Sequence, residues 1–368
     1  MIKKYLKSHF PGLVRLNRYR AAALFLKRHS FPALTDSEKR DVDDYWRQFG
    51  IKFPDYTWFR MFYGVTGIHN PRFIPDSLAH YILYPHLNFK SHIAGWDDKN
   101  VYERLVPSAT FPRSLCHCIH GRMYDSEYRP CVWGGGKMKE LAENIFAQLG
   151  GESELVFKSA CGGFQGKGVR LLHVTSPAEV LDFINTNPSS NYVLQKRIVQ
   201  HPFFNQFNSS SSNIIRVISW RDGEEIRVLS TTIRYGIEGS FTDVAFVNGK
   251  EVVHVVGIDK SGRVNERHFT GDGLNPTPPR IVTKEVPSYE KLVSIVKKAH
   301  ADLMFFDFVA WDYMIDKDGE PVCIEFNILG PGTTLYQFAN GPLAGEYTTQ
   351  FLDFLKNETV QIPRLYRA

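Results

Sequence analysis

The chain lacks several features that define large classes of proteins. Its 368 residues include five cysteines, an odd number without regular spacing, which argues for a reducing, cytosolic setting. No apolar run approaches the roughly 20 residues that a helix needs to cross a bilayer, and the basic start does not have the pattern of a secretory signal. Neither a Ser-His-Asp nor a Cys-His set stands out as a nucleophilic centre.

Acidic residues are missing from residues 1–35, which hold eight Lys or Arg, although the whole chain has a net charge of only +5. The composition of this segment favours the interpretation that it is a solvated basic helix packed on the body of the protein. Peripheral contact with the anionic inner face of a membrane is the alternative. The other 333 residues sum to −3, which does not indicate nucleic-acid binding.

Local patterns predict an α+β chain rather than a doubly wound parallel sheet. We expect a mostly helical, aromatic-rich region over 1–95, a first lobe over 96–197 and a second lobe over 198–368. Gly150-Gly151 should end one helix and Ser176 should cap the next. Helices are expected at 36–49, 97–105, 137–149, 177–185, 288–302 and 343–355, and strands at 155–158, 169–174, 192–196, 214–220, 226–235, 244–247 and 252–258.

The most informative stretch, residues 308–327, predicts a β-hairpin. Asp318-Gly319 is a strong signal for a two-residue turn between two β-like runs. In that register Asp312 lies opposite Glu325, with Cβ atoms about 5 Å apart, and Asn327 follows on the same face. The other face is expected to enter the core and carries Val309, Trp311, Tyr313, Ile324, Phe326 and Ile328.

Two opposed carboxylates repel each other unless a cation lies between them. Asp312, Glu325 and Asn327 together offer the carboxylate and amide oxygens that a hard ion such as Mg²⁺ prefers. The hairpin therefore indicates a metal site. A half-exposed hairpin with a solvated acidic face is the plain alternative.

A glycine-rich loop joins two expected strands further upstream. Backbone N–H groups of such a loop can close over phosphate oxygens, and Lys158, at the end of the first strand, would add a positive charge. The loop does not match a Walker motif, because Lys167 is followed by Gly168 and not by Ser or Thr. A flexible hairpin remains the other interpretation. The loop contains Gly162, Gly163, Gly166, Lys167 and Gly168.

Taken together, these elements resemble the ATP-grasp superfamily over about residues 97–355. The run Asp97-Asp98-Lys99-Asn100 is similar to the early Asp-Lys element of that superfamily, whose lysine reaches the nucleotide phosphates. Lys158 is similar to the second nucleotide lysine. The resemblance implies two α+β lobes that grip ATP, and one or two Mg²⁺ ions held by Asp312, Glu325 and Asn327.

The same resemblance assigns residues 192–198 to the hinge between the lobes, where adenine binds. Gln195 would meet the exocyclic amine, and the backbone from Lys196 to Ile198 would meet the ring edge. His201 follows the hinge, where either a ribose contact or a structural role is open.

Finer details are similar to the sugar-transfer-associated ATP-grasp family, found with bacterial surface-polysaccharide genes. They are His201-Pro202, residues 211–218 and residues 309–312. One departure concerns the arginine that D-alanine–D-alanine ligases carry two residues before the first metal Asp, because this chain has Ala310 there. Arg216 and Arg234 are the candidates to face phosphate instead, and ordinary ion-pair arginines are the alternative.

The resemblance implies an ATP-dependent carboxylate–amine ligase that forms an amide through an acyl phosphate. Lys158, Arg216 and Arg234 would be its catalytic cations. The donor would be a uronic acid or an amino acid, the acceptor an amine, and the setting capsule or other surface polysaccharide biosynthesis. A phosphotransferase acting on a sugar hydroxyl, with Asp243 or His201 as base, is the main rival. A non-catalytic scaffold of a polysaccharide-synthesis complex is the third hypothesis.

Overall fold

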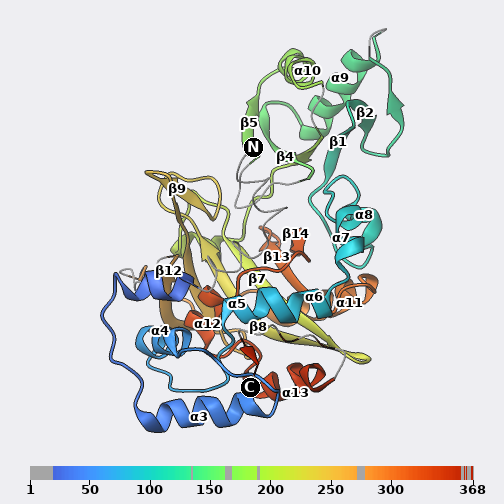
Figure 1. Ribbon diagram of the computed structural model, residues 1–368. Helices are drawn as coiled ribbons and strands as arrows, with labels where there is room; N and C mark the ends of the chain where they lie inside the picture. Colours follow the sequence, from blue (N-terminus) through green and yellow to red (C-terminus); the bar gives the residue numbers. More distant parts are fainter. Residues whose placement is uncertain are drawn as a thin grey trace.

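The computed structural model describes residues 20–133, 136–161, 168–188, 191–271, 278–357, 360, 362, 366 and 367. Two antiparallel six-stranded sheets form two lobes, and a helical N-terminal region packs on the second (Figure 1). The predicted α+β class with two lobes is confirmed. None of the helices in these ranges has the length and apolar character needed to cross a membrane.

The small lobe is a sheet with strand order β3-β2-β1-β6-β4-β5. Helices α9 (Lys137–Leu149) and α10 (Pro177–Thr186) cover one of its faces (Figure 1). Gly150, at φ +86°, ends α9, and the Ser176 side chain accepts a hydrogen bond from the Glu179 N–H at the start of α10, as expected. The strands are β1 (Ser114–Ile119), β2 (Arg122–Asp125), β3 (Pro130–Cys131), β4 (Ser153–Ser159), β5 (Val169–Val174) and β6 (Tyr192–Lys196).

The large lobe is a sheet with strand order β12-β11-β8-β7-β13-β14. Helix α11 (Tyr289–Asp302) buries Leu292, Val296 and Ala299 in the core on one of its faces. The short strands β9 (Ala245–Val247) and β10 (Lys250–Val252) pair separately. The six main strands are β7 (Ile214–Asp222), β8 (Glu225–Tyr235), β11 (His254–Ile258), β12 (Val264–Thr270), β13 (Phe308–Ile315) and β14 (Pro321–Asn327).

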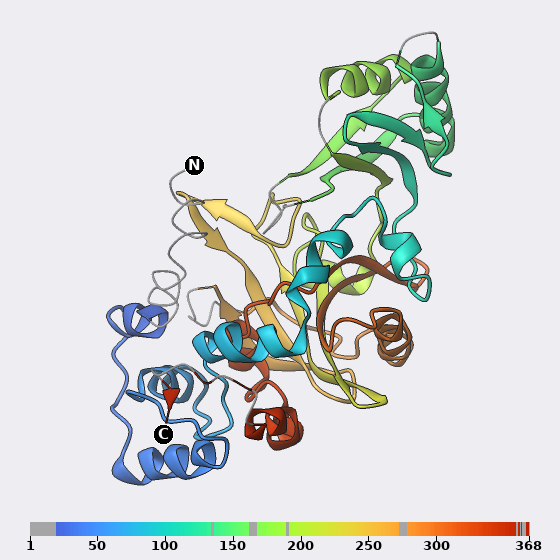
Figure 2. The same ribbon diagram turned by 45° about the vertical axis from the view of Figure 1, so that its right-hand side comes forward.

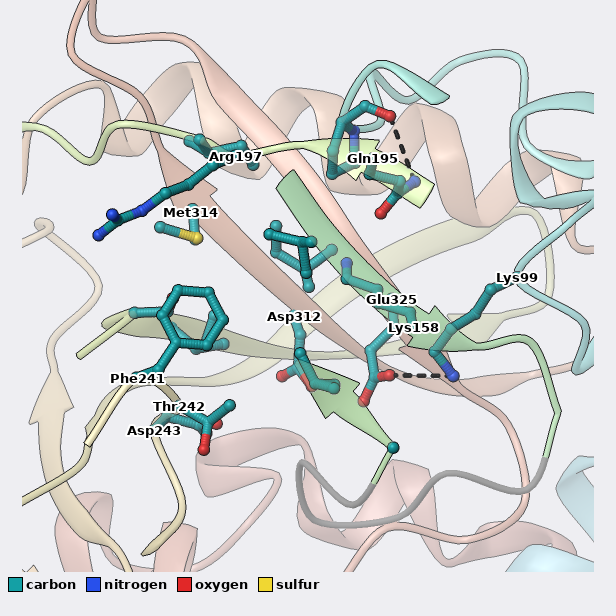
Figure 3. Close-up of a pocket in the computed structure, with 18 of the residues that line it drawn as sticks. Lys99, Lys158, Gln195, Arg197, Phe241, Thr242, Asp243, Asp312, Met314 and Glu325 are labelled. Atoms are coloured by element: carbon teal, nitrogen blue, oxygen red, sulfur yellow. Dashed lines mark hydrogen bonds and ion pairs between the residues drawn. The ribbon is translucent and has the colours of Figure 1, made fainter. Parts of the chain in front are cut away.

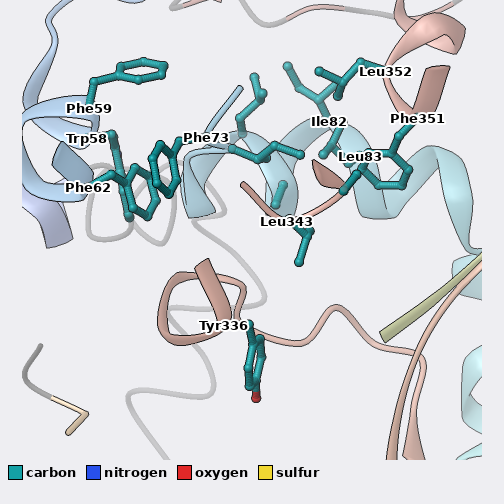
Figure 4. Close-up of a cluster of buried hydrophobic side chains, with 14 of the residues drawn as sticks. Trp58, Phe59, Phe62, Phe73, Ile82, Leu83, Tyr336, Leu343, Phe351 and Leu352 are labelled. Carbon is teal, nitrogen blue, oxygen red and sulfur yellow. The ribbon is translucent and has the colours of Figure 1, made fainter. Parts of the chain in front are cut away.

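The N-terminal helical region shares one hydrophobic core with the end of the chain and the other face of the large sheet. Figure 2 shows it against the large lobe and away from the small lobe. In this core Phe62 stacks on Phe73 at 4.6 Å (Figure 4). Phe62 also meets Phe338 edge-on at 5.9 Å. The helices are α3 (Asp36–Arg47), α4 (Thr57–Thr66), α5 (Asp76–Leu78), η1 (Ala79–Leu83) and α6 (Tyr84–Leu87) from the N-terminal side and α12 (Thr334–Asn340) from the C-terminal side.

Three short helices, α7 (Lys90–Trp96), α8 (Tyr102–Leu105) and η2 (Pro202–Gln206), lie near the chain crossings between the lobes. Ile93 and Tyr102 of the first two enter the core of the large lobe, although they precede the small-lobe strands in sequence. The domain boundaries at residues 95 and 197 stay a prediction.

The helices and strands of the C-terminal half differ from the sequence-based expectation at three elements. A single helix over 343–355 is replaced by three short turns, η3 (Gly345–Tyr347), α13 (Thr348–Phe351) and η4 (Asp353–Lys356). Phe351, Leu352 and Leu355 pack against the shared core. This packing, and not a continuous amphipathic pattern, decides the local structure of the segment. Strand β12 and helix α12 were not expected at all.

The hairpin β13–β14 has the predicted pairing at its functional end but a different turn. Asp312 pairs with Glu325, as expected, and Ala310 pairs with Asn327. The turn, however, has three residues, because the Asp316 N–H donates to the Glu320 carbonyl and Gly319 takes φ +85°. The predicted two-residue turn is therefore wrong.

A β-bulge between Asp312 and Tyr313 compensates for the longer turn. Tyr313 pairs with Cys323, so Ile324 is the extra residue on β14. Because two neighbouring residues then point the same way, Ile324 lines the pocket beside Glu325. The expectation that Ile324 enters the core with Trp311 and Phe326 is wrong for this one residue.

The shared core makes a stability prediction. Replacing Phe62, which is fully buried, by Ala should lower the free energy of unfolding by about 3–5 kcal/mol, because the ring leaves a cavity against Phe73 and Phe338. Chemical denaturation monitored by far-UV circular dichroism measures the change. Leu24→Ala, at a position that is 52% exposed, is the control. A Phe62→Ala variant as stable as this control would contradict a common core.

Candidate active site

A pocket lies between the two sheets, at the crossing from β6 into the large lobe (Figure 3). The pocket opens to solvent, and about 900 Å³ of space in and in front of it, open solvent included, is not filled by protein atoms. Strands β4 and β6 form one wall, and β13, β14 and the loop at residues 241–243 form the other. The predicted site residues that line it are Lys99, Lys158, Gly168, Gln195, Lys196, Ile198, Asp312 and Glu325.

The other predicted residues lie elsewhere. Asn327 lines a neighbouring cavity together with Lys99 and Glu325. Gly162, Gly163, Gly166 and Lys167 fall outside the described residues. Three residues, His201, Arg216 and Arg234, do not line the pocket.

His201 has a local structural role in this structure. Its ring Nδ1 accepts a hydrogen bond from the Phe203 N–H and caps η2. Its own N–H donates to the Ile315 carbonyl at 2.9 Å. These bonds fix the chain just after the hinge, and they favour the structural role that the sequence left open.

Arg216 holds the first carboxylate of the hairpin. It lies on β7 directly opposite Asp312 and binds both carboxylate oxygens, with Nη2 2.7 Å from Oδ2. Nη1 also donates to the Tyr336 hydroxyl at 3.0 Å. Burial would raise the pKa of Asp312, but Arg216 and then Arg234 hold it below its usual range. Arg216 therefore acts as the partner of the carboxylate, in line with the ion-pair alternative.

Arg234 is paired in the same way. Its Nη2 lies 2.7 Å from Oδ2 of Asp243, a carboxylate that lines the pocket. Burial raises the pKa of Asp243, and Arg234 opposes this rise. Both arginines thus contact acidic side chains that line the pocket, and neither arginine lines the pocket itself.

Two lysines face the carboxylates from the small lobe. Lys99 Nζ lies 3.4 Å from Glu325 Oε2 (Figure 3). Lys158, which is 7% exposed, lies near the same carboxylate, and burial lowers its pKa to about 8 although Glu325 opposes the shift. The repulsion between Asp312 and Glu325 is thus balanced by Arg216 from the large lobe and by lysines from the small lobe.

The segment that carries Lys99 is pinned to the small lobe. The Lys99 N–H donates to the Ala160 carbonyl at 3.0 Å, and Asn100, which is 1% exposed, donates to the Cys118 carbonyl. Asn100 Oδ1 lies 3.1 Å from Nδ1 of His117. Burial lowers the pKa of His117 to about 4, so its ring is neutral and donates through Nδ1. This rigid support explains how Lys99 is held close to Glu325 across the cleft between the two lobes.

The opposite end of the pocket is an apolar slot with one polar edge. Val156, Ile198, Met314 and Ile324 line it. Gln195 donates through Nε2 to the Pro112 carbonyl at 3.2 Å, but its buried Oε1 accepts no hydrogen bond from any described residue. A buried acceptor without a donor is costly, so this edge suits a ligand that donates from a flat ring.

The groups fit ATP and a divalent ion by their chemistry. Asp312, Glu325 and Asn327 carry hard oxygen donors. In this structure the Asn327 Nδ2 group donates to Asp312 Oδ2 at 3.4 Å, so the amide would have to turn to present its oxygen to an ion. Within the described ranges, no group of three or more His, Cys, Asp or Glu side chains has an arrangement that could hold a metal. The fit therefore depends on the amide as third ligand and on phosphate oxygens completing the shell.

Sequence reasoning missed several residues of the pocket. Phe241 and Thr242 lie on a loop whose approach depends on the Ser212 N–H donating to the Phe241 carbonyl at 2.9 Å. No local pattern marks such a long-range contact. The bulge that turns Ile324 inward also has no signal in the residue types of the strand.

This geometry defines a class of protein. Two α+β lobes that close on a pocket with two lysines, an apolar slot and opposed carboxylates form an ATP-grasp fold, as the sequence predicted. The chain belongs to the sugar-transfer associated ATP-grasp family, whose family model matches residues 80–351.

Solved structures of ATP-grasp ligases are similar to this chain at low identity. The D-Ala:D-Ser ligase VanG from Enterococcus faecalis is 14% identical, with a TM-score of 0.43, over 70% of this chain and 60% of that ligase. D-alanyl-alanine synthetase A from Vibrio cholerae is 12% identical, with a TM-score of 0.43, over 73% and 66%. The D-alanine–D-alanine ligase from Bacillus anthracis is 17% identical, with a TM-score of 0.39, over 71% and 66%. None of the curated proteins matches the chain.

The buried lysine leads to a prediction about stability. Lys158→Met should raise the free energy of unfolding by about 2–3 kcal/mol at pH 7, because a pKa lowered from 10.5 to about 8 means that the fold disfavours the charged form. The unfolded chain binds the proton more tightly, so the gain should shrink as the pH rises from 8 to 10.5. Denaturant titrations at pH 7 and pH 10 measure it.

Lys196→Met, at an exposed position on the neighbouring strand β6, is the matched control and should change little. A Lys158→Met variant that is less stable than wild type at pH 7 would mean that the lysine is held favourably in the ligand-free protein.

Proposed function

We propose that the protein is an ATP-dependent carboxylate–amine ligase that forms an amide through an acyl phosphate. The observation that carries the proposal is the register of β13 and β14. It places Asp312 opposite Glu325 at the end of a pocket that two lysines of the other lobe also reach. Carboxylates and lysines facing each other across a cleft suit a polyphosphate with its metal.

The nucleotide would lie along the pocket with its base in the apolar slot. The unpartnered Gln195 Oε1 would accept from the exocyclic amine of adenine, and the hinge backbone from Lys196 to Ile198 would meet the ring edge. Lys99 and Lys158 would hold the phosphates. Phosphate oxygens would also favour the charged form of Lys158, whose pKa is lowered in their absence.

Asp312, Glu325 and Asn327 would hold Mg²⁺, which neutralises charge on the β- and γ-phosphates when bound. Arg216 has a positioning role, because its two bonds to Asp312 keep that carboxylate ionised and correctly turned. The residues 162–167 of the glycine-rich loop are expected to cover the phosphates and lie outside the described ranges.

The reaction needs no protein nucleophile. A substrate carboxylate attacks the γ-phosphorus, which gives an acyl phosphate and ADP. An amine then attacks the acyl carbon and phosphate leaves. The ammonium form loses two protons in all, one of which the departing phosphate takes up. The family description, sugar-transfer associated, supports a sugar carboxylate or a sugar amine as one partner, within bacterial surface polysaccharide biosynthesis.

A screen for ADP release tests the proposal. Uronic acids, carboxylated nucleotide sugars and amino acids are offered as donors, with hydroxylamine present to trap an acyl phosphate as a hydroxamate. Mass spectrometry of a donor that has gained hydroxylamine minus water would support a ligase. A stable phosphoester formed without any amine would instead support the rival phosphotransferase, for which Asp243, which also lines the pocket, would be the candidate base.

Glu325→Ala should lower ADP release in the same assay on the order of 100-fold or more, because it removes one of two carboxylates from the metal end. Glu320→Ala is the matched control, since Glu320 lies on the same hairpin, outside the pocket, and forms an ion pair with the exposed Lys291. Equal rates in both variants would remove the proposed metal role. No ADP release by the wild-type protein with any donor would favour the scaffold hypothesis.

A further inference from the structure

The hydrogen-bond ladder between β13 and β14 ends beside the residues that the proposed function assigns to Mg²⁺. Its last pair is Ala310 with Asn327. Beyond this pair, Phe308 and Ile328 carry backbone groups that a continued ladder would pair. Both residues are buried, and a buried peptide group without a partner is costly. Another part of the chain must therefore close this end of the ladder.

Asn88, directly after helix α6 of the N-terminal region, closes it. Its Nδ2 group donates to the Phe308 carbonyl at 2.8 Å and to the Ile328 carbonyl at 2.7 Å. Its Oδ1 atom accepts from the Phe308 N–H at 3.0 Å. Asn88 is 2% exposed. Because a primary amide offers two donors and an acceptor, this side chain replaces a peptide group of the missing strand.

The backbone around Asn88 is itself held against the start of β13. The Asp307 N–H donates to the Leu87 carbonyl at 2.9 Å, and the Phe89 N–H donates to the Phe305 carbonyl at 3.4 Å. The segment is thus a short strand added to the sheet, and the Asn88 amide cannot move without breaking these bonds.

The chain that follows Ile328 is held from the same region. The Tyr84 hydroxyl donates to the Pro331 carbonyl. Gly330 has φ +81°, and a Cβ atom there would lie 2.5 Å from a carbon atom of the Tyr84 ring. A glycine is therefore needed for the chain to pass so close to this ring. The N-terminal region thus fixes both the end of β14 and the loop behind it.

We propose that Asn88, supported by Tyr84, positions the metal end of the active site. The inference rests on the proposed function, in which Asp312, Glu325 and Asn327 hold Mg²⁺. Asn327 lies at the last pair of the ladder, and its side chain contacts Asp312 Oδ2. If the ladder opened at this end, the amide ligand would lose its fixed distance from the carboxylates. Asn88 prevents this opening, although it does not line the pocket itself.

The test measures binding and not turnover. AMP-PNP, an ATP analogue that transfers no phosphate, is titrated by calorimetry once with Mg²⁺ and once with EDTA, and the ratio of the two Kd values gives the tightening by the metal. Asn88→Ala should reduce this tightening by about 10-fold or more, the usual effect of removing a group that orients metal ligands. Its Kd in EDTA should stay within about twofold of wild type, because Lys99, Lys158 and the hinge are unchanged.

Asn265→Ala is the matched control. Like Asn88, this residue uses its side-chain amide to hold other parts of the chain, and it bonds to the Ala339 carbonyl, the Asn340 side chain and the Arg267 N–H. It lies on β12, however, at the edge of the large sheet opposite β14. Asn265→Ala should lower the free energy of unfolding and keep the full tightening by Mg²⁺.

Tyr84→Phe is the milder variant if Asn88→Ala does not fold. It removes the hydroxyl that holds the Pro331 carbonyl, and it should reduce the tightening by Mg²⁺ by a smaller factor. Tyr366→Phe is its own control. That change removes another buried hydroxyl of the shared core, which donates to Ser77 Oγ at 2.7 Å and not to the loop after β14.

Each other outcome overturns the inference in a recognisable way. Full tightening by Mg²⁺ in the Asn88→Ala or Tyr84→Phe protein would show that these residues only stabilise the fold. An equal loss of affinity in EDTA would mean that the whole nucleotide pocket is disturbed and not its metal end. If wild type binds AMP-PNP equally well with Mg²⁺ and with EDTA, the proposed metal role itself fails. No acceptor takes part, so the choice between ligase and phosphotransferase does not affect the result.

Discussion

The opposition of Asp312 and Glu325 is the constraint on which the site depends. Two carboxylates on paired strands repel each other, and the ligand-free protein balances them with cations from different parts of the chain. Arg216 comes from the neighbouring strand of the same sheet, and Lys99 comes from the other lobe. The large lobe therefore supplies one carboxylate that is paired within its own sheet and a second one whose partner crosses the cleft. The pairing of the second depends on how the two lobes are placed.

The sequence predicted the fold class and most strands well, because period-two patterns and turn residues are local signals. It correctly placed Asp312 opposite Glu325, but it assumed a two-residue turn and a regular strand. The three-residue turn with Gly319 in a left-handed conformation shifts the pairing by one residue, and the bulge at Ile324 shifts it back. A bulge depends on how a strand must curve over its neighbours. No residue type in β14 indicates a bulge, so the sequence did not predict the orientation of Ile324.

Other parts of the site could not be read from sequence because long-range partners decide them. Arg216 and Arg234 were recognised as important cations, but whether they face phosphate or an acidic side chain depends on Asp312 and Asp243. Gln195 illustrates the opposite case. Its position in the hinge was foreseen from family resemblance, whereas its unpartnered oxygen is a property of the packed structure. In the C-terminal segment, tertiary packing replaced an expected helix by short turns.

The compensating turn and bulge have a consequence for how this hairpin tolerates a slip of its pairing. The tip at residues 317–319 is polar, and Lys317 and Asp318 are exposed, a place where proteins usually accept small changes. If the turn tightened to Asp318-Gly319, the pairs between the tip and Tyr313 would shift by one residue, and the bulge at Ile324, six residues after Asp318, would disappear. Asp312 would lie opposite Glu325 in that arrangement as it does in this one. The strand pairing next to the tip can therefore change without separating the two carboxylates.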